Sequence, residues 1–188
     1  ITHRTKAIIP VSLYGQPPDL DKIQSIADKH GLKVIIDGAQ SFGATYQGIS
    51  DSALGNISCT SFFPAKPLGC YGDGGAVFTN NPALAEKIRM LRVHGQSERY
   101  QHKYIGMGGR LDTIQAAVLL AKLPHYAEEI QLRQQVAGCY QENLNQIKGF
   151  RLPEISPDRT SVWAQYTLRA NDRPVLQARL TNAGVPTA

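Results

Sequence analysis

The feature that most constrains the fold is a strand, a helix and a second strand that follow one another near the start of the chain. The apolar runs Lys6–Leu13 and Leu32–Ile36 each predict a short buried strand. Between them, apolar residues recur at helical spacing from about Asp19 to His30, and Gly31 ends the helix. Two strands joined in this way run parallel, with a right-handed crossover. We therefore expect an α/β fold, in which ligands bind beyond the carboxyl ends of strands.

The same patterns predict further elements downstream, in this order: strands at Ile57–Phe63 and Ala76–Thr79, a helix from Pro82 to about Arg92, irregular residues 93–110, and a helical stretch from about Asp112 to Ile147 that Pro124 interrupts. From Phe150 the pattern changes to a loop, a strand at Val162–Arg169 and a helix from about Arg173 to Asn182. We therefore expect residues 1–149 to form a partial large domain, with a mostly parallel sheet and helices on both faces. Residues 150–188 are expected to begin a small α+β domain.

Composition excludes several classes of protein. Of the 188 residues, 42% are hydrophobic and 19% are charged, which argues for a globular chain and against disorder. The apolar runs are too short to span a bilayer and no secretory leader is recognisable, so we expect a cytoplasmic location without a membrane partner. Three cysteines without CxxC spacing disfavour a disulfide framework and a metal site. The first residue is Ile1, so we expect the chain to begin inside a larger protein.

The net charge of +5 is concentrated between residues 86 and 110, which contain six basic and two acidic residues. Such a segment fits a solvated helix face and loop. It also fits an anionic partner such as a phosphate, a nucleotide, a sugar acid or a nucleic acid. Both interpretations stay open on charge alone.

Three side chains near predicted strand ends could carry chemistry. Asp37 directly follows an apolar strand, Ser61 lies in the next one, and Lys66 follows in a segment rich in Gly and Pro. Singly, each also fits an ordinary turn, strand or loop residue. Together they match the needs of pyridoxal 5'-phosphate (PLP). This cofactor requires an amine for a Schiff base, a carboxylate beside the pyridine nitrogen and donors for its phosphate.

Five motifs, taken in chain order, resemble those of the DegT/DnrJ/EryC1/StrS family: Asp37-Gly38-Ala39-Gln40, Ser61 to Gly69 (SFFPAKPLG), Gly72 to Asn80 (GDGGAVFTN), Arg92-Val93-His94-Gly95 and Arg110 to Ala117 (RLDTIQAA). Members of this family are PLP-dependent sugar aminotransferases with the aspartate aminotransferase-like, type I fold. The resemblance covers essentially the whole chain. The last motif, in its longer form Arg110 to Leu123, looks most like that of members acting on UDP-linked 3-keto sugars, including 3-oxo-glucuronate derivatives.

The resemblance implies roles for four residues. Lys66 would be the catalytic, Schiff-base lysine and Asp37 would pair with the pyridine nitrogen. Gln40 would lie against the ring or its phenolic oxygen, and Ser61 would bind the cofactor phosphate. The resemblance also implies transfer of an amino group, usually from glutamate, to a keto sugar on a nucleotide, for surface-polysaccharide or secondary-metabolite sugars. The enzyme would be a homodimer without a nucleic acid partner.

The sequence departs from the family pattern in three respects. Gly108 stands where members usually carry an Asn that contacts the cofactor phosphate across the dimer. The amino-terminal third of the family and the end of its carboxyl-terminal domain lie outside these 188 residues. We therefore expect weak cofactor binding and little or no turnover from the isolated chain.

Two alternative functions stay open. The first is another type I PLP enzyme, such as a cysteine desulfurase or an aldolase, although desulfurases typically place His beside the lysine. The second is a non-catalytic basic fragment that binds nucleic acid through residues 86–110, which include Tyr100 and Tyr104.

Overall fold

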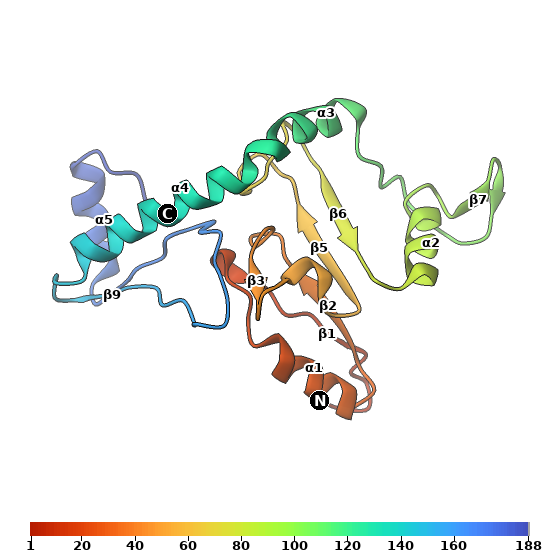
Figure 1. Cartoon of the computed structure of the whole chain (residues 1–188), viewed down its shortest axis with the longest axis horizontal. Coiled ribbons are helices and arrows are strands. Elements are labelled where there is room, and N and C mark those ends of the chain that lie inside the picture. Colours follow the sequence, from red (N-terminus) through yellow and green to blue (C-terminus); the bar gives the residue numbers. More distant parts are fainter. Residues whose placement is uncertain (188) are drawn as a thin grey trace.

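A four-stranded sheet forms the centre of the larger part of the protein (Figure 1). The computed structural model describes residues 1–187. The strands, in spatial order, are β1 (Ala7–Ile8), β2 (Lys33–Asp37), β5 (Ile57–Ser61) and β6 (Gly75–Phe78). The first three are parallel and β6 is antiparallel to β5, while α1 (Leu20–Lys29) connects β1 to β2. The predicted βαβ unit and mostly parallel sheet are confirmed.

Strand β1 is much shorter than the predicted strand Lys6–Leu13. Pro10 has no backbone N–H to donate, so it interrupts the ladder. Its carbonyl still accepts from the Asp37 N–H at 2.9 Å, and Ser12 N–H donates to the Asp37 carbonyl at 3.0 Å. The chain therefore follows β2 up to the end of the sheet although only two residues are regular strand.

The two faces of the sheet differ in burial. Val34 and Ile36 are 1% and 0% exposed and belong to one apolar cluster with residues of α1. Of the helices expected on both faces, α1 packs on this one. The opposite face presents apolar side chains to the surface, and Ile9 and Val77 remain 62% and 47% exposed.

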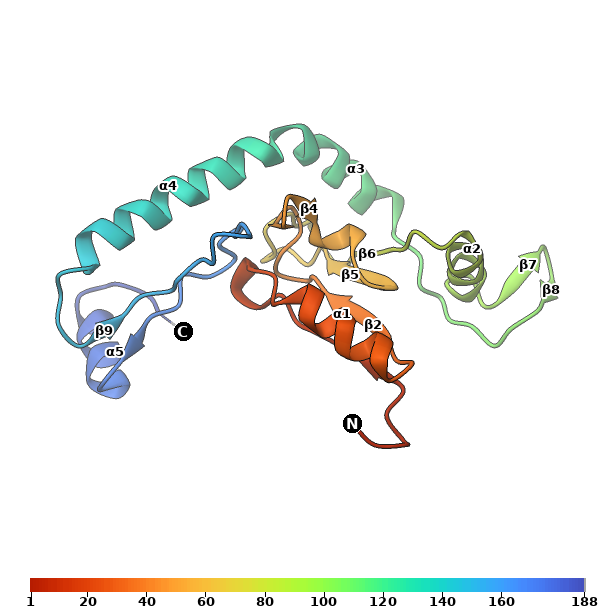
Figure 2. The same ribbon diagram turned by 60° about the horizontal axis from the view of Figure 1, so that its bottom comes forward.

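A long bent helical arm crosses from the sheet to the carboxyl-terminal part (Figure 2). It consists of α3 (Thr113–Lys122), the 3-10 turn η3 (Leu123–His125) and α4 (Tyr126–Leu144). Pro124 lies in η3, which confirms the predicted interruption. Leu119 and Tyr126 pack with Phe62 and Cys70 in a second apolar cluster. Among residues 1–187, no helix has the length and hydropathy that crossing a membrane requires.

The carboxyl-terminal part holds the antiparallel strands β9 (Phe150–Arg151) and β10 (Arg169–Ala170), followed by α5 (Arg173–Asn182). The predicted strand Val162–Arg169 is wrong over most of its length. The Val162 N–H donates to the Gly15 carbonyl of the 3-10 turn η1 (Leu13–Gly15) at 3.1 Å, and Trp163 has a φ of 50°. Docking on η1 thus replaces strand pairing here. The boundary between residues 149 and 150 stays a prediction.

Two small hairpins were not expected from the sequence. One, β3 (Thr45–Tyr46) with β4 (Ile49–Ser50), turns at Gln47 and Gly48, both with positive φ, and leads into the 3-10 turn η2 (Asp51–Ala53). The other, β7 (Gln96–Glu98) with β8 (Gln101–His102), lies within residues 93–110, which were predicted to be irregular. It extends outward beyond α2 (Pro82–Leu91) in both views (Figures 1 and 2).

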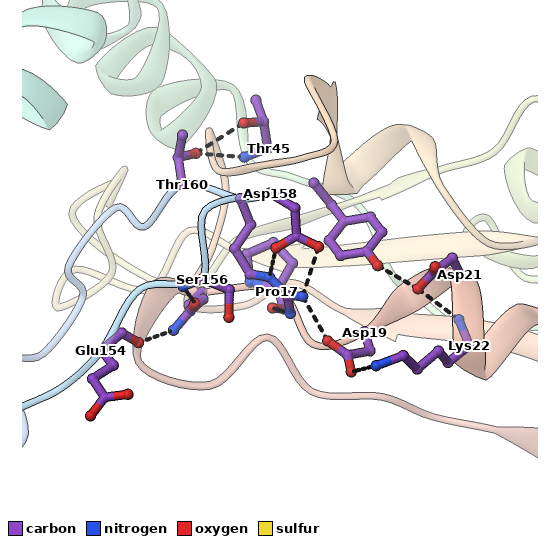
Figure 3. Close-up of polar contacts among 12 residues, drawn as sticks. Pro17, Asp19, Asp21, Lys22, Thr45, Glu154, Ser156, Asp158 and Thr160 are labelled. Carbon is purple, nitrogen blue, oxygen red and sulfur yellow. Dashed lines mark hydrogen bonds and ion pairs between the residues drawn. The ribbon is translucent and has the colours of Figure 1, made fainter.

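Arg159 ties the carboxyl-terminal part to the start of α1. Its partners Pro17, Asp19 and Asp158 are labelled in Figure 3. Its side chain is 7% exposed and donates to Asp19 at 2.6 Å, to Asp158 at 2.7 Å and to the Pro17 carbonyl at 2.9 Å. Its guanidinium carbon lies 4.8 Å from the centre of the Tyr46 ring. The hydrogen bonds from Arg159 hold the pKa of the Asp158 carboxyl below its ordinary value. This charged cluster fixes residues 154–160 against the start of α1 and the strand β3.

Gln16 provides a second attachment. Its side-chain Nε2 donates to the Glu154 carbonyl at 3.1 Å, and its Oε1 accepts from the Ser156 N–H at 3.0 Å. Glu154 and Ser156 are labelled in Figure 3. One amide side chain thus satisfies backbone groups on both sides of Ile155. The attachment depends on no charge and complements that of Arg159.

Candidate functional site

Asp37 is the last residue of β2, at the carboxyl end of the parallel strands. Its backbone is fixed on both sides by the bonds to Pro10 and Ser12. Its Oδ1 accepts from the Ala39 N–H at 3.1 Å, and the side chain is half-buried. The carboxylate is therefore oriented by its own turn, and among residues 1–187 no cation pairs with it.

Ser61 ends β5, the neighbour of β2, and lies on the same face of the sheet as Asp37. The register carries this conclusion: Asp37 lies directly opposite Cys59, and Ser61 follows Cys59 by two residues. The Ser61 Oγ accepts from the Phe63 N–H at 3.2 Å. Its own hydroxyl proton is left to donate, which is what a phosphate oxygen requires.

Cys59 lies directly opposite Asp37 and two residues before Ser61 on the same strand. Burial raises the pKa of its thiol, and the negative charge of Asp37 raises it further. Cys59 is thus held as a neutral thiol beside the carboxylate, and it is half-buried on the same face as Ser61. It provides a small, uncharged surface between two polar groups.

Gln40 follows β2 and is held by η1. Its side-chain Oε1 accepts from the Tyr14 N–H at 2.6 Å. Tyr14 has a φ of 62°, an unfavourable backbone conformation for a residue with a large side chain. The amide of Gln40 is therefore oriented by the turn that also contacts the carboxyl-terminal part.

Lys66 lies in a loop that leaves β5 and returns to β6. The Lys66 N–H donates to the Phe63 carbonyl at 2.8 Å, which closes a tight turn. At Gly69 an added Cβ would lie 2.6 Å from the Pro64 carbonyl oxygen, so only glycine allows the loop to fold back this closely. Lys66 itself is half-buried and, among the residues that the structure describes, forms no ion pair.

Helix α3 fastens this loop at two points that the sequence did not reveal. Lys122 Nζ donates to the Gly69 carbonyl at 2.7 Å, and Gln115 Oε1 accepts from the Tyr71 N–H at 2.9 Å. No local pattern distinguishes Gln115 or Lys122 from ordinary helix-surface residues. The two contacts identify α3 as the support of the Lys66 loop.

The basic segment 86–110 forms the end of α2 and the β7–β8 hairpin. Lys87 lies 5.0 Å from the ring centre of Tyr104, and Arg99 lies 5.1 Å from that of Tyr100. The two aromatic rings that a nucleic acid interpretation would use are thus paired with basic side chains of the same segment.

Gly108 lies against His94. An added Cβ at Gly108 would lie 3.2 Å from His94 Cε1, so an Asn in this place would require the imidazole to shift slightly.

The side chains of Lys66, Asp37 and Ser61 provide the groups that PLP requires, and they do not form a set of metal ligands. They combine a primary amine, an oriented carboxylate and a hydroxyl with a free proton. Within the described part of the chain, no three His, Cys, Asp or Glu residues lie close enough together to hold a metal ion. The roles of Lys66, Asp37, Gln40 and Ser61 as cofactor ligands stay predictions.

A model of the DegT/DnrJ/EryC1/StrS aminotransferase family matches residues 1–188. The chain belongs to this family. It is 57% identical over 188 residues to the UDP-2-acetamido-2-deoxy-3-oxo-D-glucuronate aminotransferase of Pseudomonas aeruginosa, a match that covers 100% of this chain and 52% of that relative. It is 43% identical over 187 residues to the dTDP-3-amino-3,4,6-trideoxy-alpha-D-glucose transaminase of Streptomyces venezuelae, covering 100% of this chain and 49% of the relative. The chain spans about half the length of these curated relatives.

Solved structures of the DegT/DnrJ/EryC1/StrS family have the same fold. An aminotransferase of this family from Brucella abortus superposes with a TM-score of 0.93 at 44% identity, covering 96% of this chain and 48% of that one. DesV of S. venezuelae, in complex with a ketimine intermediate, gives a TM-score of 0.96 at 42% identity, with coverages of 99% and 50%. The predicted partial aminotransferase fold is thereby confirmed.

Proposed function

We propose that the protein transfers an amino group from an amino acid, glutamate, to a keto sugar carried on a nucleotide, with PLP as the cofactor. The observation that carries this proposal is the placement of Asp37 and Ser61. They lie at the same end and on the same face of the sheet, with the Lys66 loop starting directly after Ser61. Family membership and the sugar aminotransferases among the relatives support it.

Each residue has a defined task in this proposal. Asp37 holds the proton on the pyridine nitrogen, Ser61 donates to a phosphate oxygen, and Gln40 lies against the ring. Lys66 binds the cofactor through its amine and, once free, moves a proton as general base and acid. Bound PLP supplies a ring that withdraws electrons from the carbon atom that loses its proton.

The decisive experiment maps where PLP becomes attached. The protein is incubated with PLP, reduced with borohydride and digested, and the peptides are analysed by mass spectrometry. We expect the pyridoxyl group on Lys66, no attachment in Lys66→Ala, and unchanged attachment in Lys148→Ala, which removes a lysine far from the site in sequence. Attachment at another lysine in the unaltered protein would contradict the assignment. The isolated 188-residue chain is expected to bind PLP more weakly than a protein that also carries the flanking family segments.

A UDP-linked 3-keto sugar, such as a 3-oxo-glucuronate derivative, is the proposed acceptor. The support is the 57% identity to the UDP-2-acetamido-2-deoxy-3-oxo-D-glucuronate aminotransferase, together with 44% identity to the UDP-N-acetyl-3-dehydro-alpha-D-glucosamine 3-aminotransferase of Acidithiobacillus ferrooxidans. The test compares UDP-linked and dTDP-linked 3-keto sugars as acceptors, with formation of 2-oxoglutarate from glutamate as the readout. A preference for the dTDP-linked sugar would overturn this assignment without affecting that of Lys66.

A homodimer is proposed as the working form. The support is a set of strongly exposed apolar side chains that continues from the β7–β8 hairpin into α3: Tyr100, Ile105, Met107, Ile114 and Leu120, which are 69–99% exposed. Apolar side chains exposed together are typical of protein–protein contact sites. Light scattering after gel filtration should give the mass of two chains, and Ile105→Asp should shift the protein toward one.

A further inference from the structure

A cavity of about 380 Å³ lies where η1 meets the carboxyl-terminal part of the protein. Its lining comes from Leu13, Tyr14 and Gln16, from residues 151–155, and from every second residue between 161 and 169. Its volume is within the range of small-molecule sites. The cavity adjoins the candidate cofactor residues, because Tyr14 lines it and donates its N–H to Gln40.

Two arginines line this cavity from directly opposite positions of a two-stranded ribbon. Arg151 of β9 pairs with Arg169 of β10, so their side chains leave the ribbon on the same face. Like charges in directly opposite positions destabilise a ribbon. Glu154 also lines the cavity, yet among residues 1–187 neither arginine forms an ion pair. The two positive charges thus share one side of the cavity uncompensated.

Two other lining residues have a backbone that its surroundings hold in place. Tyr14 and Trp163 both line it and have φ values of 62° and 50°, conformations that persist only where surrounding contacts enforce them. Those contacts are present: Val162 N–H binds the Gly15 carbonyl, and the Gln16 side chain binds the backbone on both sides of Ile155. This part of the cavity lining is therefore formed before any ligand arrives.

We propose that this cavity is a binding site for a ligand that carries two neighbouring oxyanion groups, held by Arg151 and Arg169. Guanidinium groups bind phosphate and carboxylate oxygens in pairs, and two of them side by side match two adjacent anionic groups. Two ligands share this chemistry, and their relevance depends on the proposed function. They are the diphosphate of a nucleotide sugar and a dicarboxylic amino acid such as glutamate.

The test measures binding of inorganic pyrophosphate by calorimetry to the unaltered protein and to the variants Arg151→Gln, Arg169→Gln and the double variant. We expect each single variant to weaken binding at least tenfold and the double variant to abolish it. Arg99→Gln, on the distant hairpin, is the matched control and should leave binding unchanged. Equal affinity of the double variant and the unaltered protein, or no pyrophosphate binding to the unaltered protein, would overturn the proposal.

Competition against bound pyrophosphate then shows which of the two ligands the site takes. UDP displaces pyrophosphate if the site holds the diphosphate of the sugar nucleotide, and glutamate displaces it if the site holds the amino donor. Displacement by neither overturns the proposal. A second readout needs no ligand: removal of one arginine relieves the repulsion, so Arg169→Gln should unfold at a higher temperature than the unaltered protein.

The same protein samples separate this proposal from that of the PLP site. Pyrophosphate binding should persist in Ser61→Ala and in Lys66→Ala, because neither residue lines the cavity. Loss of binding in Ser61→Ala would show that the anion occupies the candidate cofactor site instead. Failure of PLP to attach to Lys66, with pyrophosphate still bound through the arginines, would contradict the proposed function alone.

Discussion

The backbone N–H of Tyr14 donates to the side-chain Oε1 of Gln40 over 2.6 Å. This bond joins the turn η1 to the loop that follows β2, and so links the candidate cofactor site to the cavity beside it. Because η1 ends at Gly15 and Gln16 follows directly, the same stretch of chain positions Gln40 and contacts the carboxyl-terminal segment. Several consequences can be measured.

Gln40→Ala removes the acceptor of this bond. We expect the free energy of unfolding to fall by about 1 kcal/mol, the net worth of one hydrogen bond. Urea unfolding followed by circular dichroism measures the change. Gln24→Ala is the control, since Gln24 bonds only to Asp28 on the exposed surface of α1. Equal losses for the two variants would show that the Tyr14 bond contributes nothing specific.

Gly15→Ala should be among the most damaging single substitutions. Gly15 has a φ of 107°, and an added Cβ would lie 2.8 Å from the Trp163 nitrogen. Gly48→Ala is a matched control, because Gly48 has a φ of 79° with open space around it. Backbone strain alone costs about 1 kcal/mol, so we expect that loss for Gly48→Ala and at least about twice that for Gly15→Ala. Thermal unfolding of the two variants side by side distinguishes strain from the loss of docking.

Arg159→Met tests the charged cluster at the start of α1. Methionine retains an aliphatic side chain near Tyr46 but removes the hydrogen bonds that the guanidinium donates to Asp19, Asp158 and the Pro17 carbonyl. We expect a loss of about 2 kcal/mol, because these hydrogen bonds involve charged groups and the guanidinium is nearly buried. Lys22→Met removes another partner of Asp19 whose side chain is 73% exposed, and it should change stability little. A comparable loss for both variants would contradict the special role of Arg159.

Asp51 should make stability depend on pH. Burial raises the pKa of its carboxyl, against the opposing effect of the Ser41 hydroxyl. The native state therefore binds the proton more tightly than the unfolded chain, so this residue's contribution is fully favourable below the ordinary pKa of 3.8 and is lost as the pH rises through the raised value. Asp51→Asn should accordingly gain stability relative to the unaltered protein between pH 4 and pH 7.

The measurement for Asp51 is the difference in unfolding free energy between the variant and the unaltered protein at several pH values. A difference in unfolding free energy that is the same at every pH comes from the altered hydrogen bonds. A difference that grows with pH comes from the titration of Asp51. Asp73→Asn, the same substitution at an exposed position, is the matched control. A flat difference for Asp51→Asn would contradict the pKa shift.

The parts of the fold that could be predicted are those with a local signal. The spacing of Leu20 and Ala27 and the apolar run around Val34 predicted α1 and β2, because burial against one face imposes that period. The placement of Asp37 and Ser61 at strand ends followed from the same patterns. Their shared face did not, because a shift of register by one residue reverses every side chain.

No local sequence pattern predicts the contacts between segments that are distant along the chain. The predicted strand from Val162 fails because its backbone bonds to Gly15 instead of to a neighbouring strand. Nothing near Gln115 or Lys122 in the sequence indicates that they hold the Lys66 loop. Tertiary hydrogen bonds of this kind join residues whose own neighbours look ordinary, so single-sequence reasoning misses them.

The attachments made by Gly15, Gln16 and Arg159 mean that the loop between α4 and β9 is not what keeps the carboxyl-terminal segment in place. Cleavage of the peptide bond between Lys148 and Gly149 should therefore leave one particle rather than two. The two polypeptides could then be produced separately and mixed, so that altered versions of one half are assayed against an unchanged other half.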